Sequence, residues 1–358
     1  MSIATGTAVE KLEVFARTVP TDEPESDGTL EWDSTTIVVV QAHAGGTVGL
    51  GYTYTHDAAA RLIEDKLAPL VRGSDIEDVS GAWHQMGRAL RNIGRPGLGF
   101  MALSAVDIAL WDLKARLHGV PLTELLGAKR NEAPVYGSGG FTSYSLERLR
   151  SQLAGWVEAG IPRVKMKVGR SPGDDPQRLQ AARAAIGDDA ELYVDANGAF
   201  GREEAIAWAG RYGDWGVTWF EEPVTSADLR GLCVVRERAL GPLDIAAGEY
   251  AFVPADFRNL LEANAVDCLQ IDVTRCGGYT GFLRAAELAD EYGIDVSAHC
   301  APQASAHVCC AVPHFRHVEY FHDHVRVEGM LFDGVLEPEG GALRPDHARP
   351  GHGLELKA

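Results

Sequence analysis

The sequence predicts an α/β protein in which a closed barrel of parallel strands follows a smaller α+β unit. After residue 130, short apolar runs alternate with stretches of helical composition roughly eight times, which is the pattern of a (β/α) barrel. Most of these runs end in an ionisable residue and a loop, at intervals of about 20 to 30 residues. The first 130 residues have a different sequence pattern, in which a hairpin signal is followed by three helical stretches.

The alternating region has the repeat expected of successive barrel strands and covering helices. Helical composition is clearest at 146–160, 175–187 and 278–293. The eight expected strands lie at 134–141, 163–169, 191–197, 217–223, 244–250, 266–274, 295–302 and 317–321. In such a barrel the carboxyl ends of the strands share one mouth, where each strand presents a functional group.

Alternation of side chains along each expected strand places the ionisable groups inside the barrel. Residues two apart share a face of a strand, so Lys165 and Lys167 point one way while Val164 and Met166 point toward the covering helices. The same test turns these residues inward: Tyr193, Asp195, Asn197, Gln270, Asp272, Ser297, His299, His317 and Glu319. It turns Glu222 and Cys300 outward. Burying so many charges is costly unless they are paired or bind a cation.

The first 130 residues read as an antiparallel meander packed on helices. Two strand-like runs, 35–43 and 48–55, flank a Gly-Gly turn at 45–46, which is a hairpin signal. Three helical stretches follow, at 57–71, 76–93 and 100–118. The acidic stretch 17–33 carries two prolines and no periodicity, so we expect a loop between two strands there, of a length often found in lids.

Composition excludes several classes of function. The chain has 358 residues, a formal charge of -18 and a pI near 5.1, which disfavours nucleic acid and anionic membranes as partners. No apolar run approaches membrane-spanning length, and the N-terminal sequence lacks the order of a signal peptide. We therefore expect a soluble, cytoplasmic protein. Its 6 cysteines form no CxxC pair, which predicts reduced structural thiols.

Seven segments carry a specific resemblance to a known family. They are VKMKVG, YVDANGAF, WFEEP, AAGEY, QIDVTRCGG, SAHCAP and VEYF, in this order. Together they resemble the mandelate racemase subgroup of the enolase superfamily, and the resemblance extends over nearly the whole chain. It implies a modified TIM barrel of the (β/α)7β type, an α+β capping domain, a magnesium ion and removal of a proton alpha to a carboxylate. We expect the cap at 1–130, the barrel at 131–325 and a C-terminal segment, 326–358, that returns to the cap.

Three carboxylates on adjacent strands are the expected metal ligands. Asp195, Glu221 and Glu249 offer hard oxygen donors suited to one Mg²⁺ per subunit. The alternative for any one of them alone is a structural ion pair with a lysine. The resemblance further implies that Lys165 and Glu319 bind the substrate carboxylate, with Glu319 protonated when it donates.

Two candidate bases remain, together with a possible substrate contact. We expect Lys165 and the metal to lower the pKa of Lys167 toward working pH. His299 pairs in this reading with Asp272, which fixes its tautomer; without Asp272 it would be read as a core histidine. Asn197 is a candidate for substrate contact, with support of the metal site as the alternative. His322, Asp323 and His324 are expected to form a polar loop rather than a metal site.

The expected reaction is dehydration of an acid sugar, an aldonate or aldarate, to a 2-keto-3-deoxy acid, which is hydro-lyase chemistry. Racemisation or epimerisation of a 2-hydroxy acid uses the same two bases and is the main alternative. A metal- and ligand-binding scaffold without turnover is the alternative from another class, although it would not need two proton-transfer groups. The partner is then a small carboxylate, and the resemblance suggests a homo-oligomer, either a dimer or an octamer.

Overall fold

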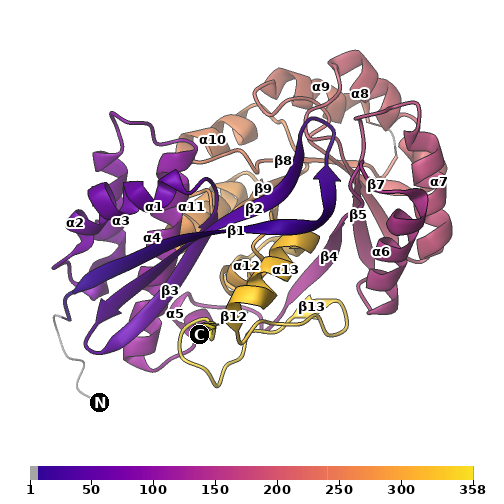
Figure 1. Ribbon diagram of the computed structural model, residues 1–358. Helices are drawn as coiled ribbons and strands as arrows, with labels where there is room; N and C mark the ends of the chain where they lie inside the picture. Colours follow the sequence, from indigo (N-terminus) through magenta and orange to yellow (C-terminus); the bar gives the residue numbers. More distant parts are fainter. Residues whose placement is uncertain (1–6, 240, 358) are drawn as a thin grey trace.

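The computed structural model describes residues 7–239 and 241–357 and consists of a cap packed against a barrel (Figure 1). None of the helices within these ranges combines the length and the apolar character needed to span a bilayer. The expected fold class is confirmed by the strand pairing and by the order of the elements.

The cap is a three-stranded antiparallel sheet covered by helices. Its strands are β1 (Lys11–Ser26), β2 (Glu31–Ala44) and β3 (Thr47–Tyr54). The helical elements are α1 (Ala58–Leu62), the π-helical turn η1 (Ile63–Leu67), α2 (Ala68–Val71), the 3₁₀ turn η2 (Ile76–Asp78), α3 (Val79–Ala89) and α4 (Leu98–His118). The long helix α4 lies directly on β3, where a Cβ atom at Gly51 would stand 2.2 Å from the Ala105 carbonyl oxygen.

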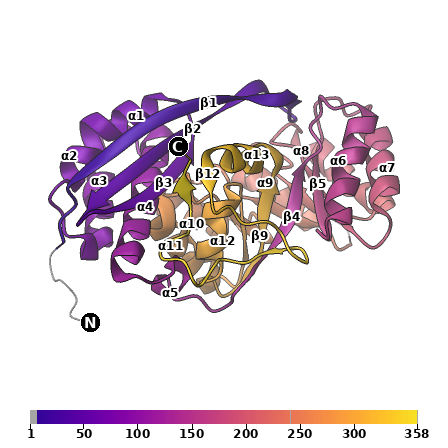
Figure 2. The same ribbon diagram turned by 60° about the horizontal axis from the view of Figure 1, so that its bottom comes forward.

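The expected loop at 17–33 is wrong, because most of this stretch is strand. β1 pairs with β2 as far as Ser26 and Glu31, with a shift of register between Pro20 and Glu25. β1 is an edge strand, and an edge strand tolerates proline because one side of its backbone needs no partner. The two strands form a long arm that reaches from the cap over the barrel (Figure 2).

Eight parallel strands form the closed barrel. They are β4 (Ala133–Gly139), β5 (Arg163–Lys167), β6 (Glu191–Asp195), β7 (Val217–Glu221), β8 (Asp244–Ala247), β9 (Cys268–Ile271), β10 (Asp295–Ala298) and β11 (Phe315–Phe321). Pairing of β11 with β4 closes the ring. Every expected barrel strand overlaps an observed one.

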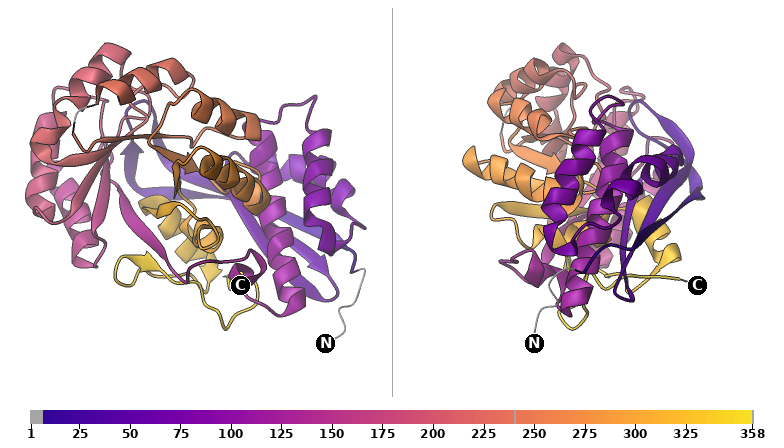
Figure 3. Two further views of the ribbon diagram at one scale, coloured as in Figure 1. Left: turned by 180° about the vertical axis from the view of Figure 1, so that it is seen from behind. Right: turned by 90° about the vertical axis from the view of Figure 1, so that its left-hand side faces the viewer.

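Helices form the outer layer of the barrel, seen from behind in Figure 3. They are α6 (Leu146–Glu158), α7 (Asp175–Ile186), α8 (Arg202–Ala209), α9 (Leu229–Arg238), α10 (Pro254–Glu262), α11 (Gly278–Glu291) and α12 (Pro302–Cys309), with the 3₁₀ turn η3 (Tyr212–Trp215) after α8. An eighth helix, α13 (His322–Leu331), follows β11. The polar loop expected at 322–324 is therefore the first turn of a helix.

The C-terminal segment connects the barrel to the cap. β13 (Ala342–Leu343) pairs with β4, and β12 (Phe332–Asp333) pairs with β14 (Glu355–Leu356). Near the short cap-to-barrel helix α5 (Leu122–Leu125), the buried His352 bonds to two cap groups, the Asp112 carboxylate and the Leu50 carbonyl. These contacts support the expected return to the cap, while the exact domain limits stay a prediction.

Side chains inside and outside the barrel follow the predicted alternation. Val164, Met166 and Leu192 pack with the surrounding helices in the main apolar core. Inside, aromatic and small side chains form a separate cluster, in which the rings of Tyr193 and Trp219 stack at 5.4 Å. This inner cluster is separate from the apolar core that surrounds the barrel.

Candidate active site

All nine predicted site residues come together at the carboxyl ends of the barrel strands. Lys167, Asp195 and Glu221 are the last residues of β5, β6 and β7. The other six lie on or just after the strands, and all but one are buried: Lys165, Glu249, Asp272, His299 and Glu319, with Asn197 half-buried. The order of the barrel thus brings residues from positions 165 to 319 to one site.

The three expected metal ligands form a tight cluster of oxygens. One oxygen each of Asp195, Glu221 and Glu249 lies within 4.8 Å of the others, and all three side chains are buried. Burial and the neighbouring Asp195 raise the pKa of Glu221 to about 8, because the negative charges of the two carboxylates repel each other. A dication would relieve this repulsion, and three carboxylates are the donors that magnesium prefers. The donor set therefore fits Mg²⁺.

Lys165 is fully buried among carboxylates. Its Nζ lies 2.6 Å and 2.7 Å from the two Glu221 oxygens and 2.8 Å from Oε1 of Glu319. These partners hold the pKa of Lys165 above its usual value although burial alone would lower it. The ammonium is therefore a fixed positive charge between the expected metal ligands and Glu319, where a substrate carboxylate is expected to bind.

The pKa of Lys167 depends on opposing charges, and its expected lowering by Lys165 together with a bound metal stays a prediction. Burial and Lys165 do lower it, but the ion pair with Asp195 outweighs both and raises the pKa above its usual value. Asp195 is also an expected metal ligand. A cation bound there would neutralise the carboxylate and so weaken its hold on the Lys167 proton.

His299 is held by Asp272 as predicted. Its Nδ1 lies 2.7 Å from Oδ2 of Asp272, whose Oδ1 in turn accepts hydrogen bonds from both the backbone N–H and the hydroxyl of Thr274. Burial lowers the pKa of His299, but nearby acidic groups, including Glu249 and Asp272, raise it well above its usual value. The direction of this shift favours the imidazolium form, which is able to donate a proton.

The surroundings of Glu319 favour its carboxylate form in this arrangement, while its expected protonation when it donates to a substrate stays a prediction. Burial raises its pKa, but Lys165 and His299 outweigh burial and lower it below the usual range. Ser138 donates its hydroxyl to Oε1 at 2.5 Å, and the Cys300 backbone N–H donates to Oε2 at 3.1 Å. The carboxylate is thus an acceptor on both of its oxygens.

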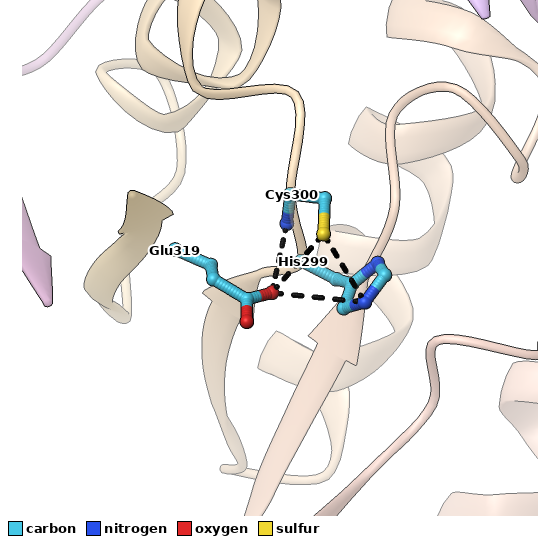
Figure 4. A group of neighbouring side chains, drawn as sticks. All are labelled: His299, Cys300 and Glu319. Carbon is cyan, nitrogen blue, oxygen red and sulfur yellow. Dashed lines mark hydrogen bonds and ion pairs between the residues drawn. The ribbon is translucent and has the colours of Figure 1, made fainter. Parts of the chain in front are cut away.

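Cys300 faces the site, whereas strand alternation predicted that it faces outward. Its Sγ lies 3.4 Å from Nε2 of His299 and 3.4 Å from Oε2 of Glu319, as Figure 4 shows. β10 ends at Ala298, and Cys300 has a φ of 51°. A residue in this left-handed conformation no longer follows the alternation of a strand.

Glu222, which alternation also turned outward, has a left-handed backbone as well. Its φ of 39° follows directly on the end of β7, and the side chain is 1% exposed. Burial and the charge of Glu249 raise the pKa of Glu222 well above its usual value. Asp195 and Glu221 act on Glu222 in the same direction, so it belongs to the acidic surroundings of the metal cluster.

A cavity of about 230 Å³ lies between this cluster and the cap arm. On the barrel side Lys167 and His299 both line it, from strands separated around the ring by β4 and β11. Asn197 lines it as well, and its Oδ1 is buried without a hydrogen-bond partner. That unpaired acceptor supports the prediction that Asn197 contacts a ligand.

Several residues of this cavity were not predicted from the sequence. They are Asp27, Trp32, Ser34 and Thr35 from the arm, with Tyr250, Arg275, Phe321 and His324 from the barrel side. Thr29 at the tip of the arm donates its hydroxyl to the Asn197 carbonyl at 3.4 Å. These residues reach the site through packing of the cap on the barrel, and only the acidic stretch 17–33 signalled that a lid was possible.

Fold and site together define an enzyme with paired proton-transfer groups beside a cluster of hard metal ligands at the mouth of a capped barrel. Residues 11–127 match the N-terminal domain of the mandelate racemase / muconate lactonizing enzyme family, and residues 148–358 match the enolase C-terminal domain-like family. The chain therefore belongs to the mandelate racemase / muconate lactonizing enzyme family, whose two domains these matches cover.

Three relatives place the chain within the family. It is 32% identical to the 3,6-anhydro-alpha-L-galactonate cycloisomerase of Streptomyces coelicolor, over 97% of this chain and 96% of that one. A mandelate racemase/muconate lactonizing enzyme-like protein from Rubrobacter xylanophilus is 58% identical, with a TM-score of 0.96 over 98% and 97% of the two chains. The L-talarate/galactarate dehydratase of Salmonella typhimurium, solved with Mg and L-lyxarohydroxamate, is 30% identical, with a TM-score of 0.90 over 100% and 93%.

Proposed function

We propose that this protein is a magnesium-dependent dehydratase of acid sugars, which removes the proton alpha to a carboxylate and expels the beta hydroxyl. The observation that carries the proposal is the placement of Lys167 and His299 on one cavity beside the carboxylates of Asp195, Glu221 and Glu249. The hydro-lyase activity in the name of the Salmonella relative, and the magnesium in its structure, support the same chemistry.

The residues divide the reaction between them. Lys165 neutralises the substrate carboxylate, and its fixed ammonium makes the alpha proton more acidic. Lys167 takes that proton once Asp195 no longer holds its ammonium. His299, kept cationic by its acidic neighbours, donates a proton to the departing hydroxyl. Magnesium held by the three carboxylates would stabilise the negative charge that develops on the substrate as the proton leaves.

The lining of the cavity suits a polyhydroxylated substrate. Asn197, Ser34 and Thr35 offer hydroxyl and amide groups along a space of about 230 Å³. Sugar hydroxyls both donate and accept hydrogen bonds, so they match such a lining better than an apolar 2-hydroxy acid does.

A single experiment tests the proposal against its alternatives. The magnesium-loaded protein is incubated in heavy water with a library of hexonates, pentonates and aldarates, and the products are read by NMR. A 2-keto-3-deoxy product is expected. Exchange of the alpha proton without loss of water would instead establish a racemase or epimerase. Absence of both exchange and product with every acid would leave the non-catalytic scaffold.

Two variants separate the proposed bases. Lys167→Ala is expected to abolish removal of the alpha proton, since Lys167 is the one lysine among the described residues that line the cavity. His299→Asn is expected to abolish dehydration and to retain slow exchange of the alpha proton with solvent. Full activity of both variants would refute the assignment of roles.

Assembly and location complete the proposal. We propose a homo-oligomer, a dimer or an octamer, on the strength of the family resemblance, and light scattering tests it directly. A monomer at micromolar concentration would contradict it. A cytoplasmic location is supported by the acidic composition and by cysteines that are all free, Cys233, Cys268, Cys276, Cys300, Cys309 and Cys310.

A further inference from the structure

His299, Cys300 and Glu319 form a second group of metal-ligating atoms beside the carboxylate cluster. Nε2 of His299, Sγ of Cys300 and an oxygen of Glu319 lie within 4.8 Å of one another, and all three residues are buried (Figure 4). The proposed reaction uses the imidazole and the carboxylate but has no role for the thiol. Because nitrogen and sulfur are softer ligands than carboxylate oxygen, an imidazole, a thiol and one carboxylate together favour zinc, whereas three carboxylates favour magnesium.

The distances within this group match the edges of a zinc coordination tetrahedron. Zinc binds sulfur at about 2.3 Å and nitrogen or carboxylate oxygen at roughly 2.0 to 2.2 Å, so its ligand atoms stand about 3.3 to 3.6 Å apart. Here Sγ lies 3.4 Å from Nε2 and 3.4 Å from Oε2, and Nε2 lies 3.6 Å from Oε2. A zinc ion bound by these three atoms therefore needs little movement of the side chains.

The surroundings of the group complete a zinc site. Nδ1 of His299 is bonded to Asp272 at 2.7 Å, and a carboxylate on the second ring nitrogen is the usual support of a zinc-bound histidine. Lys165 pairs with Oε1 of Glu319, and Oε2, which accepts one hydrogen bond from the Cys300 backbone N–H, keeps a second lone pair for the metal. His299 and Cys300 also line the cavity, so a fourth position is open to water or to a ligand.

We propose that His299, Cys300 and Glu319 bind Zn²⁺ at a site that adjoins the magnesium carboxylates but shares no ligand with them; Nε2 of His299, which lies 3.0 Å from Oε2 of Glu249, gives up that ion pair when zinc binds. Binding displaces two protons to solvent, the thiol proton of Cys300 and the Nε2 proton of the His299 imidazolium, and leaves a thiolate and a neutral imidazole on the metal. Because zinc then occupies Nε2 of His299, it blocks proton donation by that residue. The site is therefore inhibitory and competes with substrate rather than with magnesium.

Cobalt tests the site by spectroscopy, independently of any activity. Co²⁺ replaces Zn²⁺ in such sites, and a thiolate bound to it gives a charge-transfer absorption in the near ultraviolet. One equivalent of Co²⁺ added to the full chain in excess Mg²⁺ is expected to produce this absorption, and Zn²⁺ is expected to remove it. Absence of the absorption in the unmodified protein would overturn the proposal, whatever the substrate proves to be.

Cysteine variants then test whether Cys300 supplies the thiolate that binds the metal. Cys300→Ser and Cys300→Ala are expected to lose the absorption and to weaken Zn²⁺ binding by at least about 100-fold, since even supporting residues of metal sites contribute roughly 10- to 100-fold. Cys233→Ser is the matched control, because Cys233 is a free thiol on α9 outside the cavity, and it should keep both. Absorption retained in both Cys300 variants would refute the site, as would zinc inhibition that excess Mg²⁺ reverses.

Discussion

Asp272→Asn is the substitution with the most definite expected outcome, because two separate consequences follow from the contacts of Asp272. The first is electrostatic. At 2.7 Å from Nδ1 of His299, a unit charge contributes about 1.5 kcal/mol at the dielectric constant of water and about 6 kcal/mol at an effective value of 20. Glu249 and Glu319 remain near the imidazole, so we expect the pKa of His299 to fall by about 1 to 3 units.

The second consequence is a change of tautomer. Oδ1 of Asp272 accepts the backbone N–H and the hydroxyl of Thr274, each at 2.7 Å. These donors require the amide oxygen of an asparagine on their side, which turns its NH₂ group toward Nδ1 of His299. The imidazole then accepts at Nδ1 and carries its proton at Nε2 as a neutral group. Loss of the correctly protonated imidazole should lower kcat by roughly 10²- to 10⁴-fold.

The assay is the pH dependence of kcat for the 2-keto product. His299 donates in its cationic form, so activity is present below its pKa and is lost as pH rises through it. Lowering that pKa moves the alkaline limb of the profile to lower pH. Asp107→Asn is the control, since the buried Asp107 also accepts the backbone N–H and the hydroxyl of a threonine, Thr280, one on each carboxylate oxygen, and lies outside the cavity. An Asp272→Asn enzyme with kcat within about threefold of the parent and an unmoved alkaline limb would refute the reasoning.

Three further predictions concern carboxylates. Mg²⁺ at about 100 times its Kd should stabilise the protein by roughly 2.7 kcal/mol in thermal unfolding. Glu221→Gln should remove most of this stabilisation. An equal stabilisation of that variant by Mg²⁺ would exclude Glu221 as a ligand. Burial raises the pKa of Glu328 to about 8, so its contribution to stability is full below pH 4.5 and is lost toward pH 8. Between pH 5.5 and 7.5 the free energy of unfolding of the parent should fall by up to about 3 kcal/mol relative to that of Glu328→Gln. Urea unfolding measures this, with the exposed Glu291→Gln as control. Parallel pH profiles of the parent and Glu328→Gln would contradict the prediction. Asp27 lines the cavity and should repel a second substrate carboxylate, so Asp27→Asn should raise kcat/KM for an aldarate over the matching aldonate by about tenfold, and an unchanged ratio would exclude that repulsion.

The barrel and the nine site residues could be predicted because each depends on local pattern. Alternation within a strand is a property of the backbone, and it identified Lys165, Lys167 and Asp195 as inward before any contact was known. The order of the strands then placed Glu249 and His299 near them, since consecutive parallel strands are neighbours in a barrel. Family resemblance added roles to these positions, but their convergence follows from the fold.

The cap arm and the protonation states could not be predicted because they depend on distant contacts. Pro20 and the acidic residues of 17–33 carry a loop signal, yet pairing with β2 makes the stretch a strand. The pKa of Lys167 is set by Asp195, 28 residues away in sequence, and that of Glu319 by Lys165. Such pairings exist only once the chain is folded, so residue type and spacing do not report them.

Backbone conformation at the strand ends explains why more side chains reach the site than the alternation of side chains along a strand predicts. The non-glycine residues with positive φ within the described ranges are Asn197, Glu222, Asn264, Cys300 and Ala301. All but Asn264 lie within three residues of the ends of barrel strands that carry the site. A strand can point only every second side chain inward, but a left-handed residue after its end adds another. Such conformations cost about 1–3 kcal/mol each and persist where surrounding contacts fix them. At Cys300 the bond from its N–H to Glu319 supplies such a contact, and the same turn brings the thiol beside His299 to form the proposed zinc site.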